Sequence, residues 1–117
     1  MIYRIKDWNE HFEVAQGRIC AKMTWVAVSN RHDGKGFRRI MSHPRAGDLF
    51  AAWVLIIQVA SKIKKRGLLV DLDGALTAED LADKTGFRQE CFELAFTELV
   101  KPRFGWLEKV KNEIDKK

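Results

Sequence analysis

A long apolar run marks the middle of the chain. It covers Leu49–Ile57, and apolar residues return after the single polar Gln58. Its length and lack of turn residues favour a helix from Asp48 to about Lys64. Because a helix that is apolar on every side must be covered on every side, we expect it to be the buried centre of the domain. A membrane span needs about 20 apolar residues, so this run is too short to be one.

Weaker patterns precede this helix. Alternation at Ile2–Ile5 is typical of a short strand, and Trp8 and Phe12 follow it as apolar anchors. The further elements expected before the central helix are a strand at Met23–Val28, a loop at Arg31–Gly36 and one or two helical turns at Phe37–Met41.

Turn and capping signals organise the residues that follow it. The expected order is a strand at Gly67–Val70, a turn at Asp71–Gly74, a helix capped by Thr77, a left-handed turn at Gly86, a helix at Arg88–Val100, a strand at Phe104–Glu108 and a charged tail at Lys109–Lys117. Thr77 is a good N-cap because its hydroxyl can accept from the third amide of the helix. The apolar positions of the second helix recur at intervals of three and four residues: Phe92, Ala95, Phe96 and Leu99.

This order predicts an α+β fold, a small winged helix-turn-helix domain with a central buried helix and an N-terminal β-containing extension. We expect one domain over residues 1–117, with the extension at 1–43, the winged-helix core at 44–108 and the tail at 109–117. In this arrangement residues 104–108 would pair with 67–70 as the start of the wing. Fold alone leaves function open, since winged helices also serve as protein-interaction modules.

The charge is unevenly distributed along the chain. The formal net charge is +5 and the pI is near 9.4, which suits a polyanionic partner. Residues 1–70 carry a net +8 and residues 71–117 a net −3. The first half is therefore the expected polyanion-binding half.

Residues on the second helix of the hairpin are the candidates for reading bases, because that helix enters the major groove in the usual docking. They are Arg88, Gln89 and Thr97. Arg and Gln side chains can pair with guanine and adenine edges. Glu90 and Glu93 share this helix and would repel phosphates, so a merely solvated helix face is an equal reading.

Two basic clusters are the candidates for phosphate contacts. The first follows the central helix and contains Lys62, Lys64, Lys65 and Arg66; the second surrounds two glycines and contains Arg31, Lys35, Arg38 and Arg39. Lys and Arg supply the sequence-independent part of DNA affinity. The first cluster also favours the helix dipole, and a plain basic surface loop is the favoured description of the second.

Catalytic and metal chemistry find little support. His32-Asp33 lacks further ligands at a metal-binding spacing, and no set of nucleophile, base and acid is evident. We therefore expect no catalytic residue, no metal and no cofactor. Cys20 and Cys91 are expected to be buried thiols of a cytoplasmic protein. The four tryptophans, at positions 8, 25, 53 and 106, are expected to pack in the core or at seams between elements.

Several of these segments resemble one family. Trp25–Gly34 with Phe37–Ile40, the apolar helix through Gln58–Lys62, and Gly105–Glu108 are similar to the N-terminal winged-helix domains of phage and prophage replisome organisers and replication initiators. The resemblance runs from Tyr3 to Glu108. It implies duplex DNA binding or contact with a replisome protein, such as a helicase or its loader, and no catalysis. Such proteins often continue further, so the chain is expected to be a stand-alone version or part of a longer protein.

The leading hypothesis is thus a replication-associated DNA-binding winged helix. The alternative is a protein-protein interaction or dimerisation module in which the acidic hairpin face contacts a partner or a second copy. A metal-dependent enzyme ranks third. No membrane partner is expected.

Overall fold

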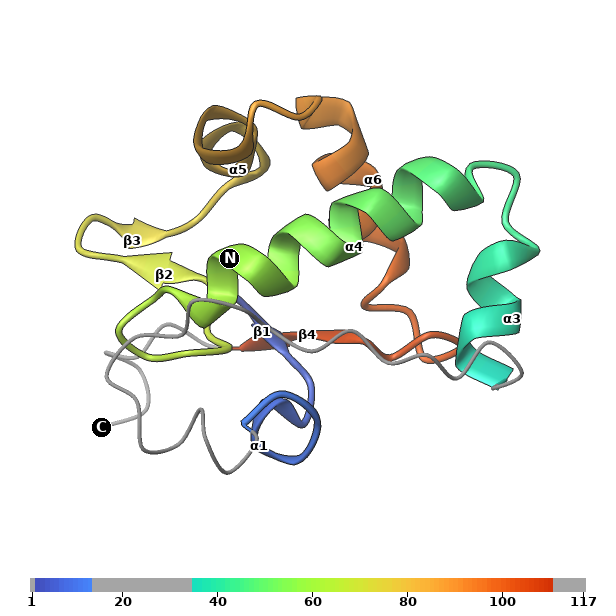
Figure 1. Cartoon of the computed structure of the whole chain (residues 1–117), viewed down its shortest axis with the longest axis horizontal. Helices are drawn as coiled ribbons and strands as arrows, with labels where there is room; N and C mark the ends of the chain where they lie inside the picture. Colours follow the sequence, from blue (N-terminus) through green and yellow to red (C-terminus); the bar gives the residue numbers. More distant parts are fainter. Residues whose placement is uncertain (1, 14–34, 111–117) are drawn as a thin grey trace.

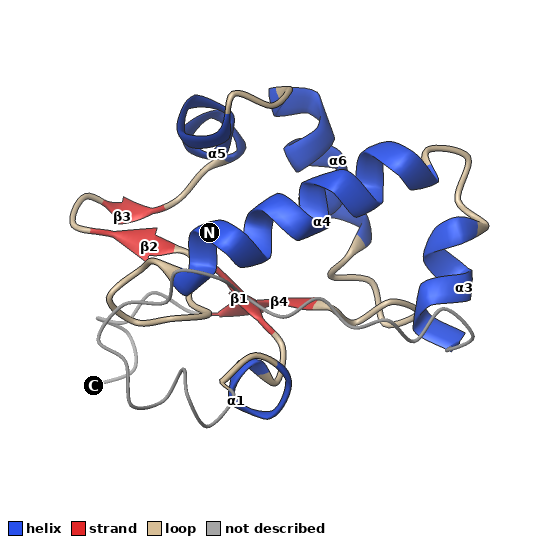
Figure 2. Ribbon diagram, in the orientation of Figure 1, coloured by secondary structure: helices blue, strands red, loops and turns tan. Residues whose placement is uncertain are grey.

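The computed structural model of the chain describes residues 2–13 and 35–110 and has an α+β composition (Figures 1 and 2). The elements in chain order are β1 (Ile2–Ile5), α1 (Trp8–His11), α3 (Lys35–Met41), α4 (Ala46–Ser61), β2 (Val70–Asp71), β3 (Gly74–Ala75), α5 (Ala78–Thr85), α6 (Gln89–Glu98) and β4 (Leu107–Val110). Within these residues, no helix combines the length and the apolar character needed to cross a bilayer. The expected strand at Met23–Val28 and the residues Cys20 and Trp25 lie outside the described ranges.

Helix α4 runs across the middle of the molecule, with α3 near its first turn and the β2–β3 hairpin near its last (Figure 1). It packs against α3, α5 and α6. Leu49, Ile56 and Ile57 are fully buried, and burial of each such side chain stabilises the fold by about 1.5–3 kcal/mol. The prediction of a central helix is confirmed.

Two details of that prediction are wrong. The helix ends at Ser61, so Lys62 to Lys64 follow it rather than belong to it. It is also not buried on every side, because Val54 and Leu55 are only half-buried and Gln58 is exposed. Neighbouring elements cover one face fully, and the apolar residues of the other face form part of a groove described below.

The predicted helix pair at residues 77–100 is confirmed. Thr77 Oγ1 accepts from the Asp80 amide at 3.1 Å, and the Asp80 carboxylate accepts from the Thr77 amide at 2.9 Å. This reciprocal capping box begins α5. Gly86 ends it in the left-handed conformation, at φ 77°. The apolar face predicted for the second helix is buried in α6: Phe92, Ala95 and Phe96, with Leu99 as the C-cap residue.

The predicted wing pairing is wrong. Strand β4 pairs antiparallel with β1, with Ile2 opposite Val110. The other edge of β1 lies against residues 67–69: the Ile5 amide donates to the Gly67 carbonyl at 2.8 Å, and the Leu69 amide donates to the Tyr3 carbonyl at 2.9 Å. Strand β1 therefore separates the two segments that were expected to pair. It belongs there because Ile5 is buried and Tyr3 stacks on Phe96 at 4.3 Å, so β1 supplies core contacts along with its backbone hydrogen bonds.

The chain forms a two-residue hairpin where the Asp71–Gly74 turn was predicted. Val70 lies opposite Ala75, and Asp71 opposite Gly74. Only Val70 of the predicted 67–70 strand is part of β2, while Leu68 makes an isolated bridge to Arg4.

Aromatic residues connect the N-terminal segment to the core. Trp8 and Phe12 stack at 4.7 Å and are both buried, as expected. Trp53 is buried and its ring centroid lies 5.0 Å from that of half-buried Trp106. The packing predicted for the tryptophans is thus confirmed at the three described positions.

Helix α3 begins earlier than predicted. Lys35 and Gly36 were expected in a loop but form its first turn. A β-carbon on Gly36 would lie 3.2 Å from Nε1 of Trp106, so the missing side chain lets α3 approach this indole closely.

Candidate nucleic-acid interface

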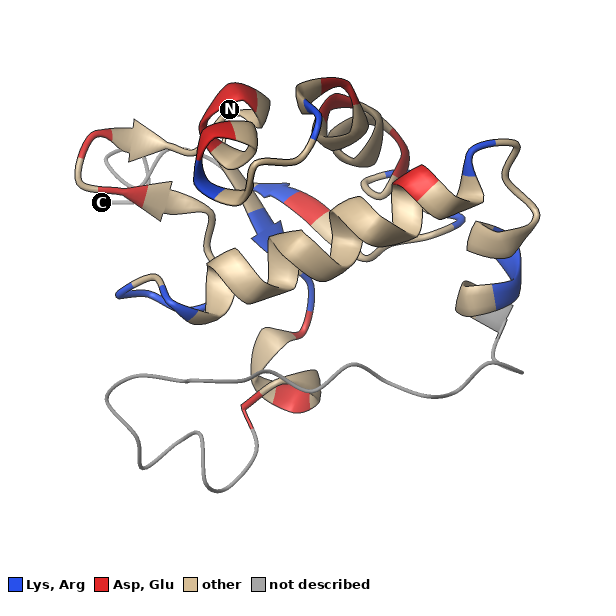
Figure 3. Ribbon diagram, turned by 45° about the horizontal axis from the view of Figure 1, so that its top comes forward, with Lys and Arg blue, Asp and Glu red and all other residues tan. Residues whose placement is uncertain are grey.

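Six exposed basic residues gather at one end of the molecule, where α3 and the start of α4 meet the two ends of α6. We call this surface the basic end; its members are Arg38, Arg39, Arg45, Arg88, Lys101 and Arg103. Figure 3 shows Lys and Arg on α3 and before α4, whereas Asp and Glu predominate on α5, α6 and the hairpin. The contacts described next involve five of these cations, and Arg38 is next to Arg39 on α3.

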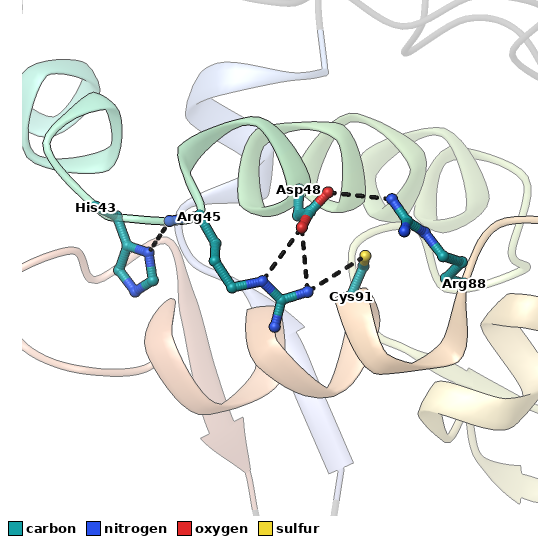
Figure 4. A network of polar contacts seen from close by, with 5 residues as sticks. All are labelled: His43, Arg45, Asp48, Arg88 and Cys91. Atoms are coloured by element: carbon teal, nitrogen blue, oxygen red, sulfur yellow. Dashed lines mark hydrogen bonds and ion pairs between the residues drawn. The ribbon is translucent and has the colours of Figure 1, made fainter.

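Asp48, in the first turn of α4, is shared by two arginines (Figure 4). Its Oδ2 accepts from Nε and Nη2 of Arg45 at 3.2 and 3.1 Å, and its Oδ1 accepts from Nη2 of Arg88 at 3.3 Å. Nη2 of Arg45 also lies 3.9 Å from Sγ of Cys91, which is buried as expected. One carboxylate between two guanidinium groups leaves a net positive charge, and Arg88 remains 63% exposed.

Glu98, near the end of α6, is the second carboxylate of the basic end and contacts two basic side chains. Nζ of Lys101 lies 2.6 Å from its Oε2, and Nε2 of His43 lies 3.2 Å from its Oε1. The hydrogen bond from Lys101 is the largest effect that lowers the pKa of Glu98, with its charge and His43 adding to it against partial burial. Nδ1 of His43 accepts from the Arg45 amide at 3.0 Å, so Nε2 carries the proton donated to Glu98. This carboxylate is therefore ionised, but basic neighbours already compensate it.

Arg39 ties α3 to the segment after α6. Its Nη1 donates to the Arg103 carbonyl at 2.8 Å. The guanidinium of Arg103 lies 5.0 Å from the centroid of the Phe104 ring, within cation–π distance. Both contacts leave the side chains exposed. The basic end is thus held together by tertiary contacts while its cations face solvent.

The structure separates the two clusters predicted to bind phosphate. Arg38 and Arg39 belong to the basic end, whereas Lys62, Lys64 and Lys65 are exposed at the opposite end of α4 (Figure 3). Arg31 lies outside the described residues, and Lys35 is the first residue of α3.

Arg66 differs from the other members of its cluster. Its Nε and Nη2 donate to the two carboxylate oxygens of Glu13, both at 2.7 Å, and its side chain is only 19% exposed. The indole of Trp8 donates to the same carboxylate. This arrangement is a structural ion pair beneath the surface, not an outward-facing cation.

The candidate base-reading residues lie on α6 or at its N-cap, but hydrogen bonds within the protein engage each of them. Arg88 is the N-cap residue and binds Asp48. Nε2 of Gln89 donates to the Glu93 carboxylate at 3.1 Å, and the Thr97 hydroxyl donates to the Glu93 carbonyl at 3.0 Å. Exposed Glu90 adds to the negative charge of this face. The structure therefore places the cations at the two ends of α6 and acids along its exposed face.

Sequence reasoning missed Arg45 and Arg103. They are isolated cations in connecting segments. The Arg39–Arg103 contact, and the Asp48 carboxylate that Arg45 shares with Arg88, bring them into the basic end. The one usable signal was Pro102, which makes residues 101–103 an exposed loop.

One group of described residues has ligand atoms close enough to hold a metal ion. Asp7, Glu10 and His11 place these atoms within 4.8 Å of one another, but all three side chains are exposed. Exposed acidic groups are often close together without binding an ion, so this cluster does not define a metal site. The His32-Asp33 pair lies outside the described residues. No protein-family model, curated protein or solved structure matches the chain.

Proposed function

We propose that the chain is a winged-helix DNA-binding domain that contacts the phosphate backbone of duplex DNA through its basic end. The observation that carries this proposal is the convergence of six exposed cations from α3, the start of α4 and the two ends of α6. The two carboxylates among them, Asp48 and Glu98, are already paired with basic side chains. The element order supports the winged-helix assignment, since α4, a short hairpin, a capped helix, a glycine turn and a longer helix precede β4.

The charges of α6 favour backbone contact over deep insertion. Glu90 and Glu93 would face the phosphates if the exposed side of α6 entered the major groove. Arg88 before α6 and Lys101 after it avoid this repulsion. The duplex therefore lies across the basic end, where Arg88 and Gln89 are the residues nearest to any base contact. The proposal includes a role in phage replication, with a helicase or its loader as the protein partner.

Fluorescence anisotropy with a labelled duplex at several salt concentrations tests the proposal. The native protein binds at low salt, with an affinity that falls as salt rises. Reversing two charges, Arg38→Glu with Arg103→Glu, weakens binding at least about tenfold and reduces the salt slope by about 2, since each phosphate contact contributes about 0.9.

Lys64→Glu with Lys65→Glu is the matched control, because it reverses two exposed charges at the other end of α4. We expect it to cost far less affinity. Absence of binding by the native protein at low salt overturns the proposal. A larger loss of DNA affinity in the control variant than in the Arg38→Glu, Arg103→Glu variant would place the DNA contact at the other end of α4. Circular dichroism establishes that all variants fold.

The acidic face of α6 supports a second candidate function, a protein-interaction module. Glu90 and Glu93 are exposed there and suit a basic partner. Reversing both charges to Lys separates the two functions. If this face binds a protein partner, the two substitutions abolish that binding. If this face contacts DNA instead, they raise the affinity for DNA.

A further inference from the structure

The tip of the β2–β3 hairpin carries a fully exposed leucine. Leu72 and Met41 are the two large apolar side chains exposed among the described residues. Leu72 is the more exposed of the two, since Met41 is only 41% exposed. It lies between Asp71 and Asp73, both exposed. An apolar side chain held in water between two carboxylates makes a poor DNA contact, and a partner that buried it would need an apolar pocket and basic surroundings.

The hairpin holds this leucine in a fixed position. Asp71 pairs with Gly74 across the turn, and Oδ1 of Asp71 accepts from the Asp73 amide at 2.8 Å. Gly74 has a φ of 117°, which favours glycine. Because this turn is closed by its own hydrogen bonds, a partner can bury Leu72 at little cost in chain entropy.

A groove of about 430 Å³ lies beside the hairpin, between α4 and α5. Its apolar lining comes from Leu55, Val59, Ile63 and Leu76, and its basic lining from Lys62 and Lys84. Gln58, Asp71 and Thr85 complete the lining. The groove therefore has an apolar interior and a rim with a net positive charge, because its two lysines outnumber the single carboxylate of Asp71.

We propose that a second copy of this chain occupies the groove, so that Leu72 of each copy inserts between Lys62 and Lys84 of the other. The tip and the groove are adjacent on one surface, which allows both contacts to form about a two-fold axis. Asp73 beside Leu72 of one copy then meets the lysines beside the groove of the other. This charge complementarity, which is reciprocal within one chain, favours a second copy over an unrelated occupant.

This dimer leaves the basic end free. The hairpin lies near the last turn of α4, and the basic end lies near its first turn (Figure 1). Two copies joined at their hairpins therefore direct their basic ends outward. The inference is independent of the proposed DNA binding, because it uses none of the same residues.

Sedimentation velocity of the native chain over a wide range of concentration provides the test. The expected result is a reversible monomer–dimer equilibrium. Leu72→Ser weakens the dimer about tenfold or more, since a buried leucine is lost. Because the side chain is fully exposed in the single chain, the variant leaves the thermal stability of the monomer unchanged when it is measured at a concentration too low for the dimer to form. Met41→Ser, which removes the other exposed large apolar side chain, leaves the dimer intact.

A charge swap identifies the partner surface. Lys62→Glu and Asp73→Lys each weaken the dimer, and the double variant recovers part of the loss because opposite charges face each other again. A native chain that stays monomeric at all concentrations overturns the inference. So does a dimer that Leu72→Ser leaves unaffected, or single losses that add without recovery. DNA affinity that depends on Arg38 and Arg103 is measured separately, so either proposal can fail alone.

Discussion

Gly67 shows how a single residue joins two distant parts of the core. Its φ is 90°, and a β-carbon there would lie 2.6 Å from Cγ of Trp8. Gly67→Ala therefore combines backbone strain with a clash against a buried indole. We expect it to lower the free energy of unfolding by more than about 2 kcal/mol. Gly86→Ala is the control, with similar φ and open space around it, and should cost about 1 kcal/mol. Equal losses in urea unfolding would contradict the clash.

The capping box at Thr77 supplies a second residue-scale prediction. Thr77→Ala should lower the free energy of unfolding by about 1 kcal/mol. Thr97→Ala should have little effect, because that hydroxyl only donates to a carbonyl of its own helix. A Thr97→Ala loss as large as that of Thr77→Ala would argue against the cap. Urea unfolding measures both.

The same box makes stability depend on pH. Hydrogen bonds from the amide and hydroxyl of Thr77 lower the pKa of Asp80 below its ordinary 3.8. A lowered pKa in the folded state means that the stabilisation is present above that ordinary value and is lost as the pH falls through the folded pKa. The stability difference between the native chain and Asp80→Asn should therefore shrink on acidification below about pH 4. A difference that persists unchanged in acid would contradict this linkage.

Local sequence patterns were sufficient to predict the role of residues whose contacts are with their neighbours in sequence. Thr77 with Asp80, and Gly86 after α5, were recognisable because each motif spans only a few positions. The need for glycine at 67 was not recognisable, because the indole that excludes a side chain comes from residue 8. Only the folded chain brings the two together.

At the scale of elements, the Arg66–Glu13 ion pair fastens the segment after α4 to the segment after α1. Arg66→Met leaves a carboxylate that is 8% exposed without its bidentate partner, so we expect a loss of about 2 kcal/mol or more. Arg4→Met is the matched control: it breaks the Arg4–Glu108 pair, whose side chains are 43% and 36% exposed, and should cost under about 1 kcal/mol. Chemical denaturation of both variants checks the comparison.

DNA binding distinguishes this structural role from the phosphate contact expected from sequence. Folded Arg66→Met protein should keep the native salt slope of DNA binding. A slope reduced by about 1 would instead mark Arg66 as a phosphate contact.

Periodicity predicted which segments form elements better than it predicted how they pair. The apolar run marked α4, and the spacing of Phe92, Ala95 and Phe96 marked α6. The order of the sheet was not accessible in this way, because β1, β4 and residues 67–69 are all short and all compatible with pairing. Burial of Ile5 and the stacking of Tyr3 select β1 as the central segment.

Across the whole molecule, charge is separated by tertiary structure and not by position along the chain. The sequence suggested residues 1–70 as the polyanion-binding half, since they carry a net +8. The basic end instead takes Arg88, Lys101 and Arg103 from the net-negative half. It excludes Lys62 and Lys64, which lie at the far end of α4. Such a regrouping depends on the α4–α6 packing and cannot be obtained by counting charges.

This separation predicts that the two ends of the molecule can be inactivated independently. The Arg38→Glu, Arg103→Glu variant should lose DNA affinity and keep the native dimer constant. Leu72→Ser should lose the dimer and keep the affinity of each protomer for a short duplex. Anisotropy and sedimentation on the same preparations measure both properties. Loss of both properties in either variant would show that the two ends are coupled.

The central position of β1 has a consequence for how the chain folds during synthesis. Arg4 and Glu108, which face each other across the β1–β4 pair, are 104 residues apart in sequence. Helices α4, α5 and α6 can collapse on one another through nearby contacts while the ribosome is still translating. Residues 2–5 can pair with residues 67–69 earlier, but the β1–β4 pair must wait for residues 107–110 to emerge, and closing so long a loop is slow. Until then the nascent core exposes the apolar surface that the buried Leu107 of β4 will cover, which is the stage at which a chaperone would be most needed.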